Sequence, residues 1–360
     1  MAPKTTNLMI DLNINAAKFD PAATTEETVK AKASLANAYT TGPKWYEVGA
    51  AEYRKMREQG QTTMRAAAQV ATARDITIPS RGRGGERDIP VRICTPSNGR
   101  LARGILLHIH GGGFVLNNHR QYDSVLAKYA DGCQLMALSV GYRLAPEHPY
   151  PAATEDCIAV AEYLVEHGEE RFGSKLRFIV GNSVGGCLGA VTVFSLTRSH
   201  PSHKLAGVIF LSGQFDVTLG LPLPSTYDKP LLLNTTELQH FANAYTPGLM
   251  PKDRKRPDIS PLYEDVTTMA AAAPAHALPP ALFHIGMDDP FLDENILMTA
   301  KWQISGSEAV LRLYAGYPHG FDVLGGQPAA ECDATNTQFL NENWKRMDDA
   351  TKISGTDKSL

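Results

Sequence analysis

A serine between two glycines stands directly after an apolar run. Residues 176–180 are apolar and β-branched, and Gly181-Asn182-Ser183-Val184-Gly185-Gly186 follows them. Small and apolar residues come next, so the pattern predicts a strand, a sharp turn and a helix, which is the setting of a nucleophile elbow. Side chains two positions to either side of such a serine would collide with the strand or the helix, and glycines avoid this. By itself, the five-residue pattern also fits an ordinary strand-to-helix turn.

Three consecutive glycines follow another apolar run at residues 105–110. The sequence reads His110-Gly111-Gly112-Gly113-Phe114, and such a bend can turn backbone N–H groups toward a ligand oxygen. We expect the N–H groups of Gly112, Gly113 and Val184 to form an oxyanion hole. We expect His110 to hold the loop in shape through its ring nitrogens, with Gly111 supporting the bend. The alternative is a flexible glycine loop.

A serine nucleophile needs a base, and the base needs an acid that orients it. Of eleven histidines, His319 follows the last predicted strand and lies in a Pro/Gly loop, where a base could be presented. His108 lies inside a predicted strand and is expected to be a core residue. We predict His319 to be the base.

The acid is expected after the preceding strand, where the chain offers three aspartates. Asp289 directly precedes a proline, which prevents the strand from continuing, and it is our first choice for the acid. Asp288 is our second choice. Asp293 is expected to cap the following helix. The chain order Ser183, Asp289, His319 is typical of α/β-hydrolases.

The elements around these residues alternate between strands and helices. Predicted strands lie at 75–79, 88–94, 105–110, 135–140, 176–180, 208–212, 281–286 and 310–314. Predicted helices lie at 120–131, 154–168, 184–198, 294–304 and 334–349. The first two strands are expected to form an antiparallel hairpin. Continuous apolar strands alternating with helices indicate an α/β fold, with a mostly parallel central sheet and helices on both faces.

Two segments do not fit this alternation. Residues 1–75 carry helical patterns, which Gly42-Pro43 breaks into at least two pieces, and residues 215–275 form a long insertion with a predicted helix at 235–245. We expect both to form a helical cap over a catalytic domain spanning residues 76–350. Residues 351–360 are expected to be a disordered tail.

The motifs together resemble the hormone-sensitive-lipase-like family of α/β-hydrolases over residues 103–321. The likeness rests on the triple-glycine motif, on residues 142–153 (YRLAPEHPYPAA), on the serine turn, on Asp289-Pro290 and on His319-Gly320-Phe321. The resemblance implies an α/β-hydrolase fold with a helical cap. It also implies a carboxylesterase acting on short- and medium-chain esters through an acyl-enzyme. The family usually has Gly-Asp-Ser-Ala-Gly-Gly at the turn, so Asn182 and Val184 depart from it. We expect Val184 either to narrow the site or to favour a particular acyl shape.

Composition narrows the classes of function. Thirty-five basic residues nearly balance thirty-eight acidic ones, which gives no reason to expect nucleic acid as a partner. No apolar run reaches the ~20 residues that span a bilayer. Five scattered cysteines without C-x-x-C spacing indicate reduced core thiols, and the start of the chain does not resemble a secretion signal, so we expect a cytoplasmic protein. We expect a monomer or homodimer that needs neither metal nor organic cofactor.

Two other functions remain open from the sequence. The same fold can serve a redirected enzyme, such as an acyltransferase, lactonase or cyclase, and the departures at the serine turn are compatible with this. It can also serve as a ligand receptor without catalysis, as in the plant gibberellin receptors, which resemble this family but lack the catalytic histidine.

Overall fold

The computed structural model describes residues 14–62, 68–80, 85–272 and 278–356. Its centre is an eight-stranded sheet in the order β1-β2-β4-β3-β5-β6-β7-β8. The strand β2 runs antiparallel to its neighbours β1 and β4. The remaining strands, which follow in the order β4-β3-β5-β6-β7-β8, are all parallel to one another. The strands are β1 Ala73–Ser80, β2 Arg87–Cys94, β3 Ile105–Ile109, β4 Met136–Val140, β5 Leu176–Asn182, β6 Gly207–Leu211, β7 Ala281–Asp288 and β8 Ala309–Pro318. The predicted hairpin and the mostly parallel sheet are therefore confirmed.

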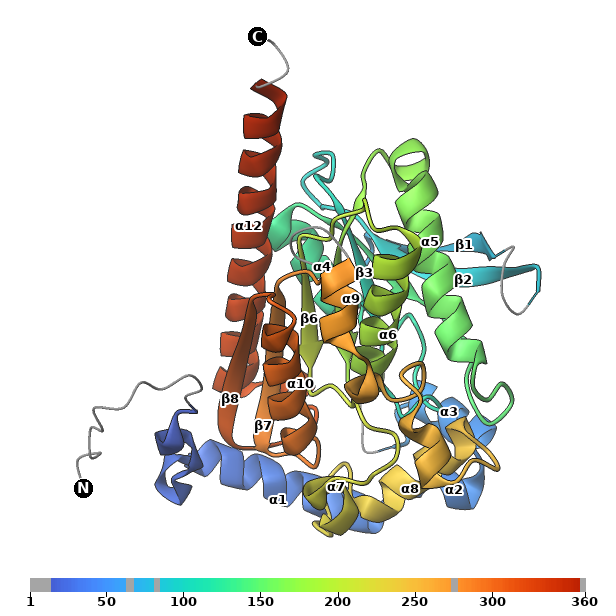
Figure 1. Ribbon diagram of the computed structural model, residues 1–360. Coiled ribbons are helices and arrows are strands. Elements are labelled where there is room, and N and C mark those ends of the chain that lie inside the picture. Colours follow the sequence, from blue (N-terminus) through green and yellow to red (C-terminus); the bar gives the residue numbers. More distant parts are fainter. Residues whose placement is uncertain (1–13, 63–67, 81–84, 273–277, 357–360) are drawn as a thin grey trace, which may run out of the picture.

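Helices cover both faces of the sheet. They are α4 Asp123–Cys133, α5 Ala152–Phe172, α6 Val184–Ser199, α10 Leu292–Ile304 and α12 Gly326–Thr356. Side chains of α5, α6 and α10 pack into the larger apolar core on one face, and those of α4 and α12 pack into a second core on the other (Figure 1). Strands β3 and β6 are buried along their whole length, which explains their continuous apolar sequences.

The N-terminal helices and the first two helices of the long insertion lie together along one end of the sheet, whereas the last helix of the insertion packs beside α10 (Figure 1). The N-terminal helices are α1 Glu26–Thr41, α2 Trp45–Val48 and α3 Ala50–Glu58, and the insertion contains α7 Pro222–Thr226, α8 Thr235–Tyr245 and α9 Val266–Ala272. The break at Gly42-Pro43 separates α1 from α2, as predicted. Below, "cap helices" means α1, α2, α3, α7 and α8.

Aromatic contacts connect the two groups of cap helices. Trp45 of α2 stacks on Phe241 of α8, with ring centroids 4.9 Å apart, and Tyr46 stacks on His240 at 3.8 Å. Trp45 and Phe241 belong to the same buried apolar cluster as the sheet residues. The helices α2, α3 and α8 are therefore packed into the main core, whereas Leu35 of α1 lies in a small separate cluster with Tyr227 and Leu231.

The last helix is longer than expected. α12 continues to Thr356, so the disordered tail predicted from residue 351 is wrong for residues 351–356, and residues 357–360 lie outside the described part. In the described parts of the chain, no helix is both long enough and apolar enough to cross a membrane.

Candidate active site

Ser183 occupies the strained turn between β5 and α6. Its backbone angles are φ 55° and ψ −120°, which a non-glycine residue adopts only under constraint. A Cβ atom at Gly181 would lie 2.2 Å from the Gly185 carbonyl oxygen, and one at Gly185 would lie 2.0 Å from that of Ile109. The glycines therefore do what the sequence indicated, since they allow the strand and helix to approach closely around the serine.

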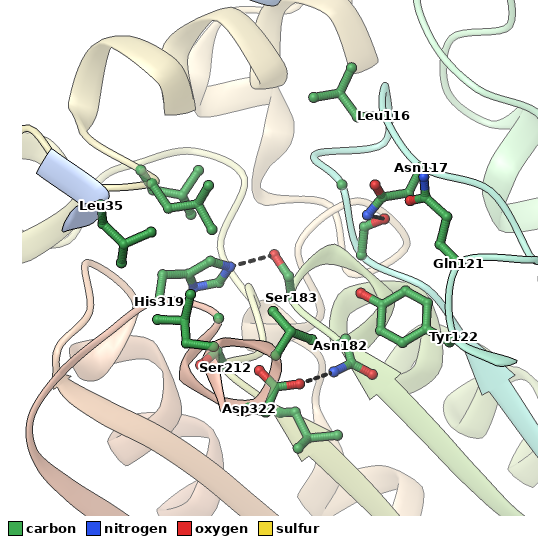
Figure 2. A pocket seen from close by; sticks show the side chains of 18 of the residues that line it. Leu35, Leu116, Asn117, Gln121, Tyr122, Asn182, Ser183, Ser212, His319 and Asp322 are labelled. Atoms are coloured by element: carbon green, nitrogen blue, oxygen red, sulfur yellow. Dashed lines mark hydrogen bonds between the residues drawn. The ribbon is translucent and has the colours of Figure 1, made fainter. Parts of the chain in front are cut away.

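The structure brings Ser183, His319 and Asp289 together. His319 Nε2 lies 2.9 Å from Ser183 Oγ, and His319 Nδ1 lies 2.9 Å from Asp289 Oδ2 (Figure 2). A carboxylate only accepts hydrogen bonds, so Nδ1 carries the proton and Nε2 is free to accept the serine proton. Three residues from the ends of β5, β7 and β8 thus form one hydrogen-bonded chain.

Asp289 is held in place by its own loop. Its Oδ1 accepts a hydrogen bond of 2.9 Å from the N–H of Phe291, and its side chain is fully buried. The Phe291 ring meets the His319 ring edge-on at 5.2 Å. These contacts fix both the carboxylate and the imidazole that it orients.

The other two aspartates of this loop have different contacts. Asp288 forms ion pairs with Lys32 of α1 and with Lys229 of the insertion, and it has no contact with His319 among the described residues. The expectation that Asp293 caps a helix is wrong, because α10 begins one residue before it, at Leu292. Its carboxylate instead accepts a hydrogen bond from the N–H of Leu223, 3.1 Å away.

The triple-glycine loop lies against the serine turn. Gly112 and Gly113 have φ values of 120° and 64°, and Cβ atoms there would clash with the Leu116 carbonyl and the Phe241 ring. Within the described residues, the N–H groups of Gly112 and Gly113 have no hydrogen-bond partner in the protein. Such unpaired donors next to a reactive serine are what an oxyanion hole requires.

His110 supports this loop with one ring nitrogen. Its Nδ1 lies 2.9 Å from the Gly111 carbonyl oxygen, its ring stacks on Tyr142, and the Tyr142 hydroxyl donates to the His110 carbonyl. Its Nε2 is buried without a partner among the described residues, which differs from the expected use of both nitrogens. Burial lowers the pKa of His110 to about 3, so the ring is neutral.

Asn182 belongs to a buried polar chain that sequence reasoning missed. Its Oδ1 lies 3.0 Å from His108 Nε2, and its Nδ2 donates a 2.8 Å hydrogen bond to Asp322 Oδ2 (Figure 2). His108 is a buried core histidine, as predicted, and burial lowers its pKa to about 4. Burial also raises the pKa of Asp322 from 3.8 to about 6. The only sequence signal for this carboxylate was its position three residues after His319.

Val184 does not narrow the site. Its side chain is buried in the main apolar core and does not line the cavity at Ser183. The valine therefore fills space behind the turn, and the expectation of a narrowed site is wrong.

A cavity of about 840 Å³ lies over Ser183 and His319. Both groups of cap helices contribute to its wall, including Leu35 of α1, Tyr53 of α3 and Phe241 of α8. Figure 2 shows Ser183 between His319 on one side and Asn117, Gln121 and Tyr122 on the other. The cavity thus surrounds the serine hydroxyl with groups from segments far apart in the chain. The five cysteines are buried and unpaired, in agreement with the sequence.

Comparison with known proteins gives the family. A family model described as alpha/beta hydrolase fold matches residues 106–323. The chain belongs to the α/β-hydrolases. This α/β-hydrolase is 32% identical to carboxylesterase NlhH of Mycobacterium tuberculosis over 246 residues, 67% of this chain and 73% of the relative. It is 28% identical to the ethyl acetate hydrolase of Pseudomonas putida, over 66% of this chain and 72% of that protein.

A solved structure agrees with the assignment. The hyperthermophilic esterase from Pyrobaculum calidifontis superposes with a TM-score of 0.73 at 25% identity, covering 87% of this chain and 97% of that one. Together these similarities assign this α/β-hydrolase to the hormone-sensitive-lipase-like branch that its motifs resemble.

Proposed function

We propose that this α/β-hydrolase is a serine carboxylesterase that hydrolyses short- to medium-chain esters. The observation that carries the proposal is the pair of 2.9 Å contacts that His319 makes with Ser183 and Asp289. The relatives named as a carboxylesterase and an ethyl acetate hydrolase support the same reaction. A cavity of about 840 Å³ suits an ester of this size.

The reaction proceeds in two steps. Ser183 Oγ attacks the ester carbonyl while His319 Nε2 takes the serine proton; the tetrahedral intermediate then collapses, and the imidazolium protonates the leaving alcohol. Water, deprotonated by the same imidazole, attacks the acyl-serine and releases the acid. Asp289 keeps the Nδ1 proton in place and stabilises the imidazolium. The N–H groups of Gly112, Gly113 and Val184 hold the negative oxygen in both steps.

The cap helices act as the wall of the substrate site. They close the cavity above Ser183, which keeps bulk water away and strengthens the interactions of the N–H donors with the oxyanion. We further propose that the protein acts in the cytoplasm as a monomer or homodimer. Its five buried, unpaired cysteines support a reducing compartment.

Replacement of the serine tests the proposal. Ser183→Ala should lower the hydrolysis of 4-nitrophenyl butyrate at least about 10³-fold and abolish labelling by a fluorophosphonate probe, with an unchanged circular dichroism spectrum. Ser212→Ala is a suitable control, because Ser212 lines the same cavity but its hydroxyl has no hydrogen-bond partner in the described structure. Full turnover by Ser183→Ala would exclude the serine mechanism. A ligand receptor would bind a small molecule without turnover and without probe labelling.

A further inference from the structure

One wall of the cavity carries a cation that pairs with no carboxylate in the described part of the chain. Arg57, near the end of α3, lines the cavity that contains Ser183 and His319. Its side chain is partly buried, and its Nε is enclosed by protein with no hydrogen-bond partner among the described residues. Burial lowers the pKa of this guanidinium, but an arginine remains charged at neutral pH. The cavity therefore contains a desolvated positive charge.

Several other enclosed arginines pair with carboxylates, and Arg254 and Arg103, which lie outside this cavity, donate to the side-chain oxygens of Asn243 and Asn341. Arg92 donates to Asp123 at 2.6 Å, and Arg143 contacts Asp156 at 3.0 Å. Arg54, three residues before Arg57 on the same helix, pairs with Glu147 at 2.9 Å. Within the described chain, Arg57 has no such ion pair. Burial of an arginine without a partner is costly, so its retention in a ligand cavity indicates that a ligand supplies the partner.

The acidic residues of the cavity do not neutralise Arg57. Burial raises the pKa of Glu237, on α8, to about 7, and the positive charge that acts on it is that of Lys44. Asp333 pairs with Lys128. Asp322 accepts its hydrogen bond from Asn182. Tyr122 and Tyr53 line the same cavity as Arg57. Both phenols stay protonated at neutral pH, because burial raises the pKa of Tyr122 to about 12 and also raises that of Tyr53.

The wall that carries Tyr122 is polar. Figure 2 shows Asn117, Gln121 and Tyr122 together on the side of Ser183 away from His319, while Leu35 lies on the His319 side. Oδ1 of Asn117 and Oε1 of Gln121 are buried without partners among the described residues. Both atoms accept hydrogen bonds, so they match donor groups of a polar ligand and would be left unpaired by an alkyl chain, whereas a carboxylate needs the donors of Arg57.

We propose that the natural substrate is an ester that also carries a carboxylate, and that Arg57 binds this carboxylate while Ser183 attacks the ester. The guanidinium provides the planar pair of N–H donors that a carboxylate accepts, and the hydroxyls of Tyr122 and Tyr53 add donors beside it. The inference rests on the proposed esterase function and specifies its substrate class. The carboxylate can belong to the acyl or the alcohol part, so the experiment includes both.

Two matched pairs of esters test the proposal. Mono-(4-nitrophenyl) adipate against 4-nitrophenyl hexanoate places the charge in the acyl part, and 4-acetoxybenzoate against its methyl ester places it in the alcohol part. The measured quantity is the ratio of kcat/KM for the charged ester to that for the neutral one. In at least one pair, Arg57→Gln should lower this ratio about tenfold or more, and Arg57→Lys should lower it less. Lys55→Gln, which removes an exposed charge from the same helix, should leave the ratio unchanged.

The outcomes separate this proposal from the esterase function. An unchanged ratio for Arg57→Gln in both pairs, or a wild-type preference for the neutral ester in both, would overturn the role of Arg57. The wild-type preference needs no variant, so it decides the question even if Arg57→Gln does not fold. If the wild type hydrolyses none of the four esters, the esterase function fails. Calorimetry of 4-acetoxybenzoate and its methyl ester with the wild type then tests carboxylate binding directly, and equal or absent binding of the two would contradict it.

Discussion

At the scale of single residues, Asn182 and Asp322 explain why the serine turn departs from its family. The family usually has an aspartate at position 182, where the Asn182 amide donates to Asp322 Oδ2 over 2.8 Å. A second carboxylate at 182 would face Asp322 at hydrogen-bonding distance, and like charges so close raise each other's pKa. The asparagine instead supplies a donor to Asp322 and an acceptor to His108, so one polar chain links the residue before Ser183 to β3 and to the segment that follows His319.

Asp322→Asn should stabilise the protein at high pH. The folded-state pKa of Asp322 is raised by burial from 3.8 to about 6. Below about pH 4 both the folded and the unfolded chain hold the proton, so the residue has no effect on the pH dependence of stability there. Between pH 4 and 6 only the folded chain keeps it, so wild-type stability falls as the pH rises, by on the order of 3 kcal/mol.

The measurement is urea unfolding at pH 4, 6 and 8. The free energy of unfolding of Asp322→Asn relative to the wild type should increase with pH and level off above about pH 6. Asp253→Asn, on the exposed surface, serves as the control for loss of one negative charge. A wild type that gains stability over Asp322→Asn as the pH rises would show that the carboxylate is stabilised as an anion.

Site residues that stand in a recognisable local sequence pattern could be predicted from the sequence. Site residues whose role depends on contacts with distant parts of the chain could not. Ser183, Asp289 and His319 each follow a strand and stand beside glycine or proline, so their place at one edge of the sheet could be inferred. Asp322 has no such mark, because its environment depends on Asn182, 140 positions away. Arg57 looks like an ordinary solvated residue on a helix, and it is distinguished by its place in the cavity without an ion pair among the described residues.

At the scale of elements, Asp288 joins the catalytic edge of the sheet to both groups of cap helices. Its carboxylate pairs with Lys32 of α1 and with Lys229, and the Tyr227 hydroxyl donates to its carbonyl oxygen at 2.7 Å. Burial alone would raise the pKa of Asp288, but hydrogen bonds from the two lysines outweigh it, and the pKa is lowered. Because Asp289 is the next residue, the position of the cap and that of the acid are linked.

Lys32→Gln should loosen α1. The Lys32 side chain is 29% exposed and faces Asp288, whereas Lys30 on the same helix is 80% exposed. Loss of a partly buried ion pair should cost about 1 kcal/mol, which corresponds to roughly fivefold faster hydrogen exchange of the α1 amides. We also expect KM to rise, since α1 lines the cavity through Leu35.

Lys30→Gln is the matched control, and it should leave both hydrogen exchange and KM near the wild-type values. Equal exchange of α1 in the two variants would mean that the ion pair with Asp288 does not hold the helix.

The elements themselves were largely predictable. The helix at 235–245 and all eight strands were anticipated to within a few residues, because each has its own period and its own glycine or proline boundary. The position of the cap helices could be inferred only as a general role for segments outside the alternation. Their contacts could not, because the stack of Trp45 on Phe241 joins residues almost two hundred positions apart.

At the scale of the whole molecule, cap and sheet share one apolar core. Trp45, Tyr53 and Phe241 of the cap helices pack in the same buried cluster as Ile109 of β3 and Phe283 of β7. A layer that is held only by its edges could open independently of the sheet, whereas here removal of the cap would expose large aromatic side chains to water. The division into cap and catalytic domain inferred from the sequence therefore says which segments build the site. We predict that the cap and the catalytic domain are not separate folding units.

Cap and sheet should accordingly unfold in a single transition. The chain has three tryptophans, with Trp45 in the cap and Trp302 in α10. A double variant, Trp302→Phe with Trp344→Phe, leaves Trp45 as the only tryptophan, and its emission in a urea titration should have the same midpoint as the far-ultraviolet circular dichroism of that variant. The reverse variant, Trp45→Phe with Trp344→Phe, reports on the sheet side in the same way.

Comparing two signals within one variant removes the effect of the substitutions on overall stability. A Trp45 transition at clearly lower urea than the circular dichroism transition would mean that the cap melts first, and the active site would then be lost before the sheet unfolds.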